Sequence, residues 1–424
     1  MKLYPSLHFS TKSFYNKNTV LILTLFFIYF LLTSCSSTKR IYEKEYFSDD
    51  GSLPVRVLVD EKQNSLSIVV KNKVKLFGDS GLIAEVKTGN RLEFSFSEQK
   101  IKLTIAGETF NSSNFWIESD SDSKLISIDK NTFRGKLRVF SADNEIKIVN
   151  ELTIEDYVKG VMTREMPVGK GTENYSALKA FSICVRTYAL TKIAQKKDSF
   201  DLYADTRDQV YGGVVSETEY TNKIVDETAG QILSFDNKPA VVFYHSTCGG
   251  FTEDVQNVFS SGYISYLKSI EDGDQPFCRI SPRYEWSEQY SESLFVSRLF
   301  NSGLIENLKY SVENISVNSR FESGRVNELE IKLISSNGEE KNISLFSNNI
   351  RSVIRTSDGR TILRSTMFDI SLDDNKDVII NGKGFGHGVG LCQWGAIGQS
   401  KMGIDFMEIL NHYFPGTEIS LIND

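Results

Sequence analysis

The sequence predicts an α+β protein in which a β-rich N-terminal region precedes a mixed region of helices and strands. From residue 54 to about residue 150, short runs alternate apolar with polar residues and are separated by turn-forming residues. This period of two is typical of antiparallel strands. After residue 152, several segments follow helical spacing instead. Hydrophobic residues make up 40% of the 424 residues and charged residues 24%, which suits a globular protein of two or three domains.

The start of the chain resembles a bacterial lipoprotein signal. Lys2, Lys12 and Lys17 precede an apolar run at residues 20–32, which leads into Leu-Thr-Ser-Cys ending at Cys35. The run is too short for an ordinary membrane span and suits the core of a signal peptide. We therefore expect Cys35 to be lipidated, which would anchor the protein in the cell envelope outside the cytoplasm, at the periplasmic face or the outer membrane. The alternative is an uncleaved anchor helix.

The remaining chain divides into a tether and two larger parts. We predict a signal peptide over residues 1–34, a tether over 35–50, a β-rich domain over 51–136, and a mixed α/β domain over 137–424 with an α/β subdomain inserted at 289–375. The net charge of −7 provides no overall basic field. We therefore predict no nucleic-acid partner.

Two helices follow the β-rich region. Thr153 can cap a helix that Pro167 ends. Residues 174–197 are apolar almost all the way round, as in a buried central helix. A narrow polar stripe on this second helix includes Lys179 and Arg186, and Arg186 is either half of a structural ion pair or a cation that faces a ligand cleft. Further helices are expected at residues 291–301, 392–402 and 405–414.

Glu165 is the carboxylic acid that we select as a candidate for catalysis. It shares the apolar face of its helix with Val161 and Met162. It also lies in the last turn, where the macrodipole disfavours a negative charge. Burial and the dipole would both raise its pKa, so that it keeps a proton near neutral pH and can protonate a glycosidic oxygen. The alternative is a surface glutamate at a frayed helix end.

The cysteines allow a disulfide or a metal site. Cys248 and Cys278 flank turn-rich sequence and could pair, although pairing cannot be read from sequence alone. Together with His245 they could supply three zinc ligands. Because no fourth ligand is near in sequence, we predict no metal and no cofactor. Cys184 is expected to be a small buried hydrophobe. A Ser-His-Asp triad stays open, although the sequence contains no G-x-S-x-G motif.

A glycine-rich segment lies at residues 381–399. Glycines occupy every second position from Gly382 to Gly390, which is the period of an extended chain. One face of such a strand carries no side chains, so another backbone or a ligand can approach closely. The spacing fits neither a dinucleotide-binding loop nor a P-loop.

A set of motifs in a fixed order resembles the SpoIID/LytB family, also called the stage II sporulation protein D family. The resemblance covers about residues 137–419, and the ordered set is far more specific than any one motif. The motifs are V-M-T-R-E-M-P (161–167), A-L-K-A (177–180), V-R-T-Y-A (185–189), Q-V-Y-x-G (209–213), H-S-x-x-G-G (245–250), S-G-R-V (323–326) and G-x-G-H-G-V-G-x-x-Q-x-G-A (384–396).

The resemblance implies a lytic transglycosylase that cleaves the glycan strands of peptidoglycan. The catalytic acid of the enzymatic members is the glutamate of the E-M-P motif, which is Glu165 here. It would protonate the oxygen that leaves C1 of N-acetylmuramic acid and accept a proton from the primary hydroxyl of the same sugar, giving an anhydro end. The first alternative is a non-enzymatic wall-binding protein that activates a cell-wall amidase, which would then be its partner. The second is a metal hydrolase that uses His245 and Cys248.

We expect glycan-binding groups among the polar residues and glycines of these motifs. The bare glycine face would let backbone approach the glycan or the helix of Glu165. Some family members hold zinc through Cys and His residues just before Q-V-Y, where this chain has Arg207 and Asp208, so we do not carry that metal over. Cys392 stands where serine is common. The candidate binding residues are Lys179, Arg186, Gln209, Tyr211, His245, Ser246, Gly250, His387 and Gln393.

Overall fold

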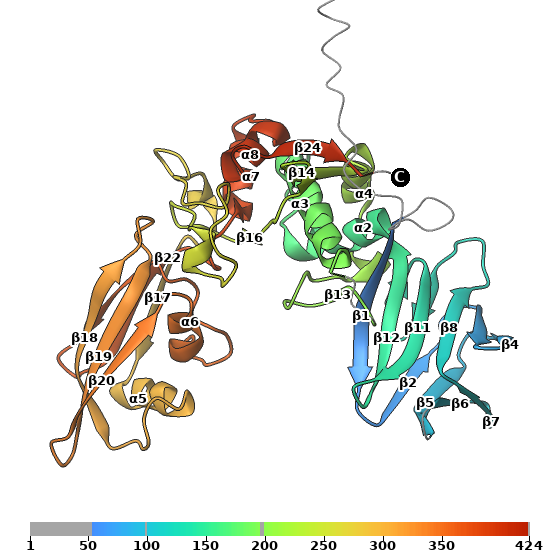
Figure 1. The fold of residues 1–424 in the computed structure, drawn as a ribbon, viewed down its shortest axis with the longest axis horizontal. Helices are drawn as coiled ribbons and strands as arrows, with labels where there is room; N and C mark the ends of the chain where they lie inside the picture. Colours follow the sequence, from blue (N-terminus) through green and yellow to red (C-terminus); the bar gives the residue numbers. More distant parts are fainter. Residues whose placement is uncertain (1–52, 98–99, 196–198, 423–424) are drawn as a thin grey trace, which may run out of the picture. The chain divides into compact units, whose positions relative to one another are not determined.

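The computed structural model describes residues 53–97, 100–195 and 199–422, and it confirms the α+β class. The predicted signal peptide, the lipidation site Cys35 and the tether lie outside these residues. Among the helices of the described ranges, none is long and apolar enough to cross a membrane. Figure 1 shows the described elements coloured along the chain.

The β-rich region contains two larger sheets and a short ribbon. The strand orders are β13-β1-β12-β11-β8-β3-β4 in the first sheet and β2-β5-β6-β7 in the second. Neighbouring strands are antiparallel except β13, which pairs in parallel with β1. The strands are β1 Pro54–Lys62, β2 Ser65–Val69, β3 Val74–Gly78, β4 Gly81–Val86, β5 Arg91–Ser97, β6 Lys100–Ile105, β7 Glu108–Ser112, β8 Asn114–Ser119, β9 Ile126–Ile128, β10 Asn131–Phe133, β11 Lys136–Ala142, β12 Glu145–Thr153 and β13 Leu202–Tyr203.

Alternate residues of these strands build a hydrophobic core. On β1, Val55 and Val57 are fully buried, as the period of two predicts. Phe94 of β5 and Phe115 of β8 meet edge to face with ring centroids 5.8 Å apart, which joins the two sheets. The hairpin of β11 and β12 completes the sheet that contains β1 and β8. The predicted boundary between residues 136 and 137 therefore falls inside this sheet.

The strand β12 runs directly into helix α2 (Ile154–Glu165). Thr153 caps this helix as predicted, because its hydroxyl accepts a hydrogen bond from the backbone N–H of Asp156 at 3.3 Å. Ile154, Tyr157 and the Val158–Met162 stretch bury the apolar face, with Lys159 half-buried among them. The same helix thus begins at the β-rich sheet and presents Glu165 at its far end.

Helix α3 (Tyr175–Ile193) is buried along most of its length and packs against α2, α7 (Gln393–Lys401) and α8 (Phe406–Tyr413). Figure 1 shows α3 in green beside the red C-terminal helices. The helix ends at Ile193 rather than at residue 197. Its nearly all-apolar surface is explained by these three partners, which come from both ends of the domain.

Short elements connect this helical core. The strand β16 pairs in parallel with β23 and so brings H-S-T-C-G-G beside the end of the glycine-rich segment. The strand β14 lies between β15 and β24. The elements are η2 Gly213–Ser216, α4 Glu219–Glu227, β14 Gln231–Phe235, β15 Lys238–Pro239, β16 Tyr244–His245, η3 Val255–Asn257, η4 Phe277–Ile280, β23 Leu391–Cys392 and β24 Glu418–Leu421.

A second hydrophobic core is formed by the region where we predicted an insertion. Its buried apolar residues run from Tyr290 to Ile380. The predicted helix at residues 291–301 is confirmed as α5. The elements are β17 Glu285–Tyr290, α5 Glu292–Asn301, β18 Tyr310–Arg320, β19 Val326–Ser335, β20 Glu340–Phe346, α6 Asn349–Ile354, β21 Phe368–Leu372 and β22 Val378–Lys383.

The glycine-rich segment is not a single strand with one bare face. Strand β22 ends at Lys383, and Gly384, Gly386, Gly388 and Gly390 all have positive φ, so every second residue takes a backbone conformation that L-residues avoid. A Cβ on Gly390 would lie 2.2 Å from the carbonyl oxygen of Phe243. The close approach that we predicted is therefore present, but the partner is the 243–248 segment at Gly384, Gly386 and Gly390 and the Arg325 side chain at Gly388, rather than α2.

Candidate active site around Glu165

The carboxyl group of Glu165 is half-buried at the C-terminal end of α2. The backbone N–H of Val210 donates to its Oε1 at 2.5 Å. Burial raises the pKa of Glu165 above its usual value of 4.5, and the hydrogen bond from Val210 opposes this rise only in part. Among the described residues, no charged neighbour contributes to the shift. Glu165 is therefore protonated more readily than a free glutamic acid.

A buried amide holds the loop that supplies Val210. The side chain of Gln209 is fully buried. Its Oε1 accepts a hydrogen bond from the Tyr157 hydroxyl at 3.0 Å, and its Nε2 donates to the Tyr244 hydroxyl at 3.1 Å. Because Tyr157 belongs to α2 and Tyr244 to β16, one amide ties three segments together. Gln209 thus holds the loop whose Val210 N–H binds Glu165. It is buried and not exposed to a glycan, although we expected it to bind one.

Gln393 reaches Glu165 from the other end of the domain. It is the first residue of α7, and its Nε2 donates to the backbone carbonyl oxygen of Glu165 at 2.8 Å. The last carbonyls of a helix have no partner within the helix, so this bond satisfies one of them and fixes the end of α2. Gln393, which we predicted to bind the glycan, thus contacts Glu165 through its buried amide, and its glycan contact stays a prediction.

Several residues near the site were missed by the sequence analysis. Asp208 accepts a hydrogen bond from the Tyr188 hydroxyl at 2.9 Å and forms an ion pair with Lys192 at 2.7 Å. The tyrosines at 157, 188 and 244 stand inside apolar runs, where a tyrosine cannot be told from a core aromatic. Tyr188 and Lys192 are four residues apart on α3, and such a polar pair on an apolar helix was the only available signal.

Arg186 has the structural role rather than the ligand-facing one. Its guanidinium is fully buried and donates to both carboxylate oxygens of Glu155, at 2.8 and 2.7 Å, and to the carbonyl oxygen of Gln231 at 2.9 Å. Lys179 forms an ion pair with Glu227 at 2.9 Å. Our assignment of Arg186 to glycan binding is not supported, because a buried guanidinium needs an internal carboxylate and finds it across the α2–α3 contact.

Tyr211 is likewise a packing residue. Its ring stacks on Tyr157 with centroids 5.4 Å apart, and its hydroxyl donates to Asn150 Oδ1 at 2.8 Å. A Cβ on Gly160 of α2 would lie 2.4 Å from this ring, so the helix needs a glycine there. In the Q-V-Y motif, Gln209 and Tyr211 thus anchor the loop against α2. The backbone N–H of Val210 is the group of this motif that binds Glu165.

The rings of the two candidate histidines, His245 and His387, meet edge to face, with centroids 5.5 Å apart. His387 Nδ1 accepts from the Val389 N–H at 3.1 Å, and its Nε2 lies 2.9 Å from the Tyr244 carbonyl oxygen. Since a carbonyl only accepts, His387 is the neutral Nε2–H tautomer. Burial lowers the pKa of His387 to about 3. Both ring nitrogens are used within the protein, so His387 has no free nitrogen for a glycan.

The other residues of H-S-T-C-G-G shape the backbone. His245 is buried, and its Nδ1 lies 3.1 Å from the Val389 carbonyl oxygen. The carbonyl oxygen of Ser246 accepts from the Trp394 N–H at 3.0 Å. Gly250 is buried with a φ of +123°. Of these residues, the half-buried Ser246 keeps the most accessible side chain.

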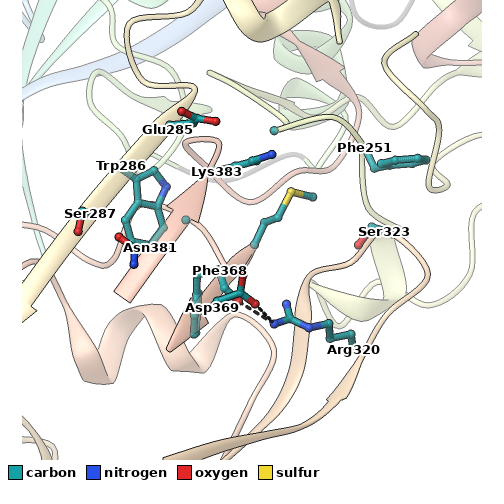
Figure 2. A pocket seen from close by; sticks show the side chains of 13 residues that line it. Phe251, Glu285, Trp286, Ser287, Arg320, Ser323, Phe368, Asp369, Asn381 and Lys383 are labelled. Carbon is teal, nitrogen blue, oxygen red and sulfur yellow. Dashed lines mark hydrogen bonds and ion pairs between the residues drawn. The ribbon is translucent and has the colours of Figure 1, made fainter. Parts of the chain in front are cut away.

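A separate pocket of 710 Å³ opens beside Gly249 and β22 (Figure 2). Trp286 and Lys383 line it, and Arg320 forms an ion pair with Asp369 at its edge, at 2.7 Å. Glu165 does not line this pocket. An aromatic face with convergent polar groups is typical of a ligand site, but the candidate acid is not among its walls.

Comparison with known proteins places the chain in a family. The family described as Stage II sporulation protein matches residues 142–235. An uncharacterized protein of Brachyspira hyodysenteriae is 32% identical over 292 residues, which cover 68% of this chain and 72% of that protein. The chain belongs to the SpoIID family. The residues that match the SpoIID family model include α2 with Glu165, the buried helix α3, and Gln209.

Two further relatives are similar over a comparable share of the chain. Stage II sporulation protein D of Bacillus subtilis is 28% identical over 289 residues, covering 64% of this chain and 76% of that protein. The Amidase enhancer of Bacillus subtilis is 28% identical over 294 residues, covering 62% of this chain and 40% of the relative. The chain thus spans less than half of that relative's length.

A domain of unknown function, DUF8618, matches residues 278–390, which include the second core.

Proposed function

We propose that this SpoIID family protein is a lytic transglycosylase of the cell envelope that cleaves peptidoglycan glycan strands at N-acetylmuramic acid. The observation that carries the proposal is the environment of Glu165. Its carboxyl group is half-buried, its pKa is raised by that burial, and a single backbone N–H binds it. Such a group keeps its proton to a higher pH than a free glutamic acid does, as a general acid requires.

The proposed reaction uses this one residue twice. Protonated Glu165 gives its proton to the glycosidic oxygen while the bond from C1 of N-acetylmuramic acid to that oxygen breaks. The resulting carboxylate then takes the proton of the primary hydroxyl on the same sugar, and that oxygen bonds to C1. The products are a strand with a free hydroxyl and a strand with an anhydro end. Glu165 is protonated again, and no water is consumed.

The surroundings of Glu165 support this reaction over hydrolysis. A retaining glycosidase needs a second carboxylate about 5 Å away, and an inverting one needs it about 6.5–9.5 Å away with room for water. In the described residues, Asp208, an acid in the loop that supplies Val210, is bound by Tyr188 and Lys192, and its side chain is 2% exposed. It is therefore not placed to activate water. The attack by the sugar's own hydroxyl removes the need for a second carboxylate.

The test is a digest of purified peptidoglycan, with and without its stem peptides, by the full chain in detergent. Mass spectrometry would read the new ends. We expect anhydro ends from the wild type, and a rate about 10²–10⁴-fold lower from Glu165→Gln, the usual contribution of a general acid. Glu219→Gln, at an exposed position in the first turn of α4, is the matched control and should keep full activity.

A second function is favoured by the similarity to the Amidase enhancer. In that case the folded protein would bind peptidoglycan and release no anhydro ends, and a cell-wall amidase would act faster in its presence. If the wild type cleaves no glycan and the amidase is stimulated in its presence, this second function would replace the first proposal. The metal hydrolase built on His245 and Cys248 receives no support, because His245 is not among the side chains that gather ligand atoms around Cys248.

The envelope location is part of the same proposal. It rests on the lipobox-like sequence at Cys35 alone. Growth with a labelled fatty acid should label the wild type and leave Cys35→Ser unlabelled. Label in both proteins, or in neither, would contradict the lipid anchor without bearing on the chemistry of Glu165.

A further inference from the structure

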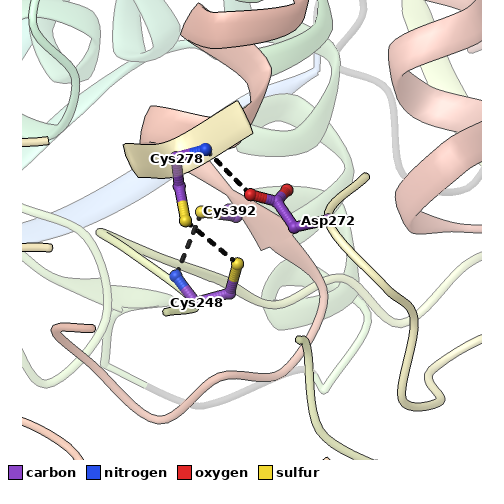
Figure 3. Close-up of side chains that lie close together, drawn as sticks. All are labelled: Cys248, Asp272, Cys278 and Cys392. Carbon is purple, nitrogen blue, oxygen red and sulfur yellow. Dashed lines mark hydrogen bonds between the residues drawn. The ribbon is translucent and has the colours of Figure 1, made fainter. Parts of the chain in front are cut away.

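Four side chains with metal-binding atoms meet in the interior of the helical part. They are Cys248, Asp272, Cys278 and Cys392, and Figure 3 shows the group. The sulfur atoms and a carboxylate oxygen all lie within 4.8 Å of one another, and all four residues are buried. The residues come from the H-S-T-C-G-G segment, the loop before η4, η4 itself, and the start of α7. The fold thus collects four ligand atoms from distant parts of the chain.

The distances suit one metal ion. Four ligands arranged tetrahedrally around zinc, with Zn–S bonds of about 2.3 Å, place two sulfurs about 3.8 Å apart. The sulfurs of Cys248 and Cys278 are 3.4 Å apart, and the largest separation in the group is within 4.8 Å. Small side-chain adjustments would bring all four atoms to bonding distance. An iron–sulfur cluster would need ligands spread around several irons.

A disulfide between Cys248 and Cys278, which the sequence left open, explains this group less well. Cys248 and Cys278 are free in the structure, and 3.4 Å is well beyond the length of a disulfide bond, about 2.05 Å. Such a bond would also leave Cys392 and Asp272 with only hydrogen bonds to offset their burial. Burying a carboxyl group and a third thiol has a free-energy cost unless something compensates it. A cation held by all four groups accounts for each of them.

Hydrogen bonds around the group orient the ligand atoms. Asp272 Oδ1 accepts from the Tyr413 hydroxyl at 2.6 Å, and its Oδ2 accepts from the Cys278 N–H at 2.8 Å. The sulfur of Cys392 accepts from the backbone N–H groups of Cys248, at 3.1 Å, and of Gly395, at 3.3 Å. Donors directed at a sulfur favour the thiolate, and supporting hydrogen bonds of this kind fix metal ligands in place.

We propose that Cys248, Asp272, Cys278 and Cys392 bind a single Zn²⁺ ion. Sulfur-rich tetrahedral sets select zinc, and four protein ligands leave no open position for substrate, so the site is structural. Binding releases the three thiol protons to solvent. Three thiolates and one carboxylate then exceed the charge of the ion, and the buried guanidinium of Arg325, whose Nη2 donates to the Cys248 carbonyl oxygen at 2.6 Å, offsets part of the excess.

The ion would also support the candidate active site. Cys392 caps α7, and the next residue, Gln393, holds the carbonyl oxygen of Glu165. Fixing Cys392 to Cys248 and Cys278 therefore fixes the residue that orients the end of α2. Arg207 and Asp208 are not members of the group. Sequence spacing alone did not reveal it, because Asp272 and Cys392 are distant in the chain.

The first test measures metal content of the full chain, purified in detergent under reducing conditions without chelators. Mass spectrometry of the metals should find about one zinc per chain, and Cys392→Ser should lose it. Cys184→Ala is the matched control, since Cys184 is equally buried in α3 but lies outside the group. It should keep its zinc.

A second test does not depend on the folding of a variant. Zinc is removed from the wild type with a chelator, and Co²⁺ or Zn²⁺ is added back. We expect the bands of a tetrahedral cobalt thiolate site, and a thermal midpoint that falls on removal and recovers on addition. The proposal would be overturned if the protein is metal-free and its thermal midpoint does not change when either ion is added. It would also be overturned if peptide mapping of protein from the envelope finds a Cys248–Cys278 disulfide. Neither readout uses catalysis, so the result is independent of the transglycosylase proposal.

Discussion

Helix α2 carries Glu155 in its first turn and Glu165 in its last, and the two carboxylates have opposite environments. Glu155 receives two hydrogen bonds from the buried guanidinium of Arg186 and one from the Gly230 N–H at 3.0 Å. Glu165 receives one hydrogen bond, from the Val210 N–H. The helix dipole favours a negative charge at the first position and disfavours it at the second.

The difference separates a structural carboxylate from a reactive one. Glu155 joins α2 to α3 and has its oxygens engaged by the protein. Glu165 keeps capacity for a further partner, and burial raises its pKa. A burial value alone does not distinguish the two, because both are half-buried. The number and charge of their hydrogen-bonding partners distinguish them. Substitutions at the two ends of α2 should therefore change different properties of the protein.

The largest effect on stability is expected at Glu155. Glu155→Gln removes the charge that compensates Arg186, and breaking a buried ion pair in this way costs about 3–5 kcal/mol. Because the side chain of Glu155 is 25% exposed, we expect the free energy of unfolding to fall by about 3 kcal/mol, at the low end of that range. Urea unfolding would measure it.

Asp156→Asn is the control for this substitution. Asp156 also lies in the first turn of α2, but its pair with Arg134 is longer, at 3.7 Å, and partly exposed. The control should lose less than about 1 kcal/mol. Equal losses from both variants would mean that the buried pair is not what joins α2 to α3.

The next effect concerns the hydrogen bond to the end of α2. Gln393→Ala removes the donor to the Glu165 carbonyl oxygen, and the freed helix end should misplace the carboxyl group. We expect kcat for anhydro-end formation to fall about tenfold, which corresponds to about 1.4 kcal/mol, with little change in KM. Gln399→Ala is a matched control, because Gln399 lies on the same helix, is buried, and has no partner for its Nε2 among the described residues. A wild-type kcat for Gln393→Ala would show that the bond does not orient Glu165.

The pH dependence of activity should report the raised pKa of Glu165. The proposed reaction begins with the protonated carboxyl group, so kcat/KM should be high at low pH and fall as pH rises through the pKa of Glu165. Since burial raises that pKa, the fall should lie above 4.5, the usual value for glutamic acid. A pH profile of the wild type measures it. A fall centred at or below 4.5 would contradict the assignment.

The smallest effect is on stability at the active end of the helix. A carboxyl group whose folded-state pKa is raised stabilises the fold fully below its unfolded pKa, and that contribution is lost as pH rises through the folded pKa. Glu165→Gln cannot ionise. Its thermal midpoint should therefore equal or exceed that of the wild type above neutral pH, the reverse of Glu155→Gln. A variant less stable than the wild type at high pH would show that the ionised carboxylate has a stabilising partner.

The sequence by itself determined the local elements of this protein and its candidate acid. Thr153 and Asp405 accept hydrogen bonds at the starts of α2 and α8, as their residue types predict. Alternation predicted the β-rich region, and helix position selected Glu165 before the family resemblance implied its role. These features depend on neighbours a few residues away, so spacing is enough to read them.

The tertiary structure alone decided the partners. Arg186 was equally consistent with an ion pair and with a ligand cleft until the fold placed Glu155 against it. The glycine period was consistent with a flat strand until the fold showed positive φ from Gly384 to Gly390, with the 243–248 segment packed against three of these four glycines. The group around Cys392 joins residues up to 144 positions apart. Contacts across such separations depend on how packed elements meet, and no local spacing records them.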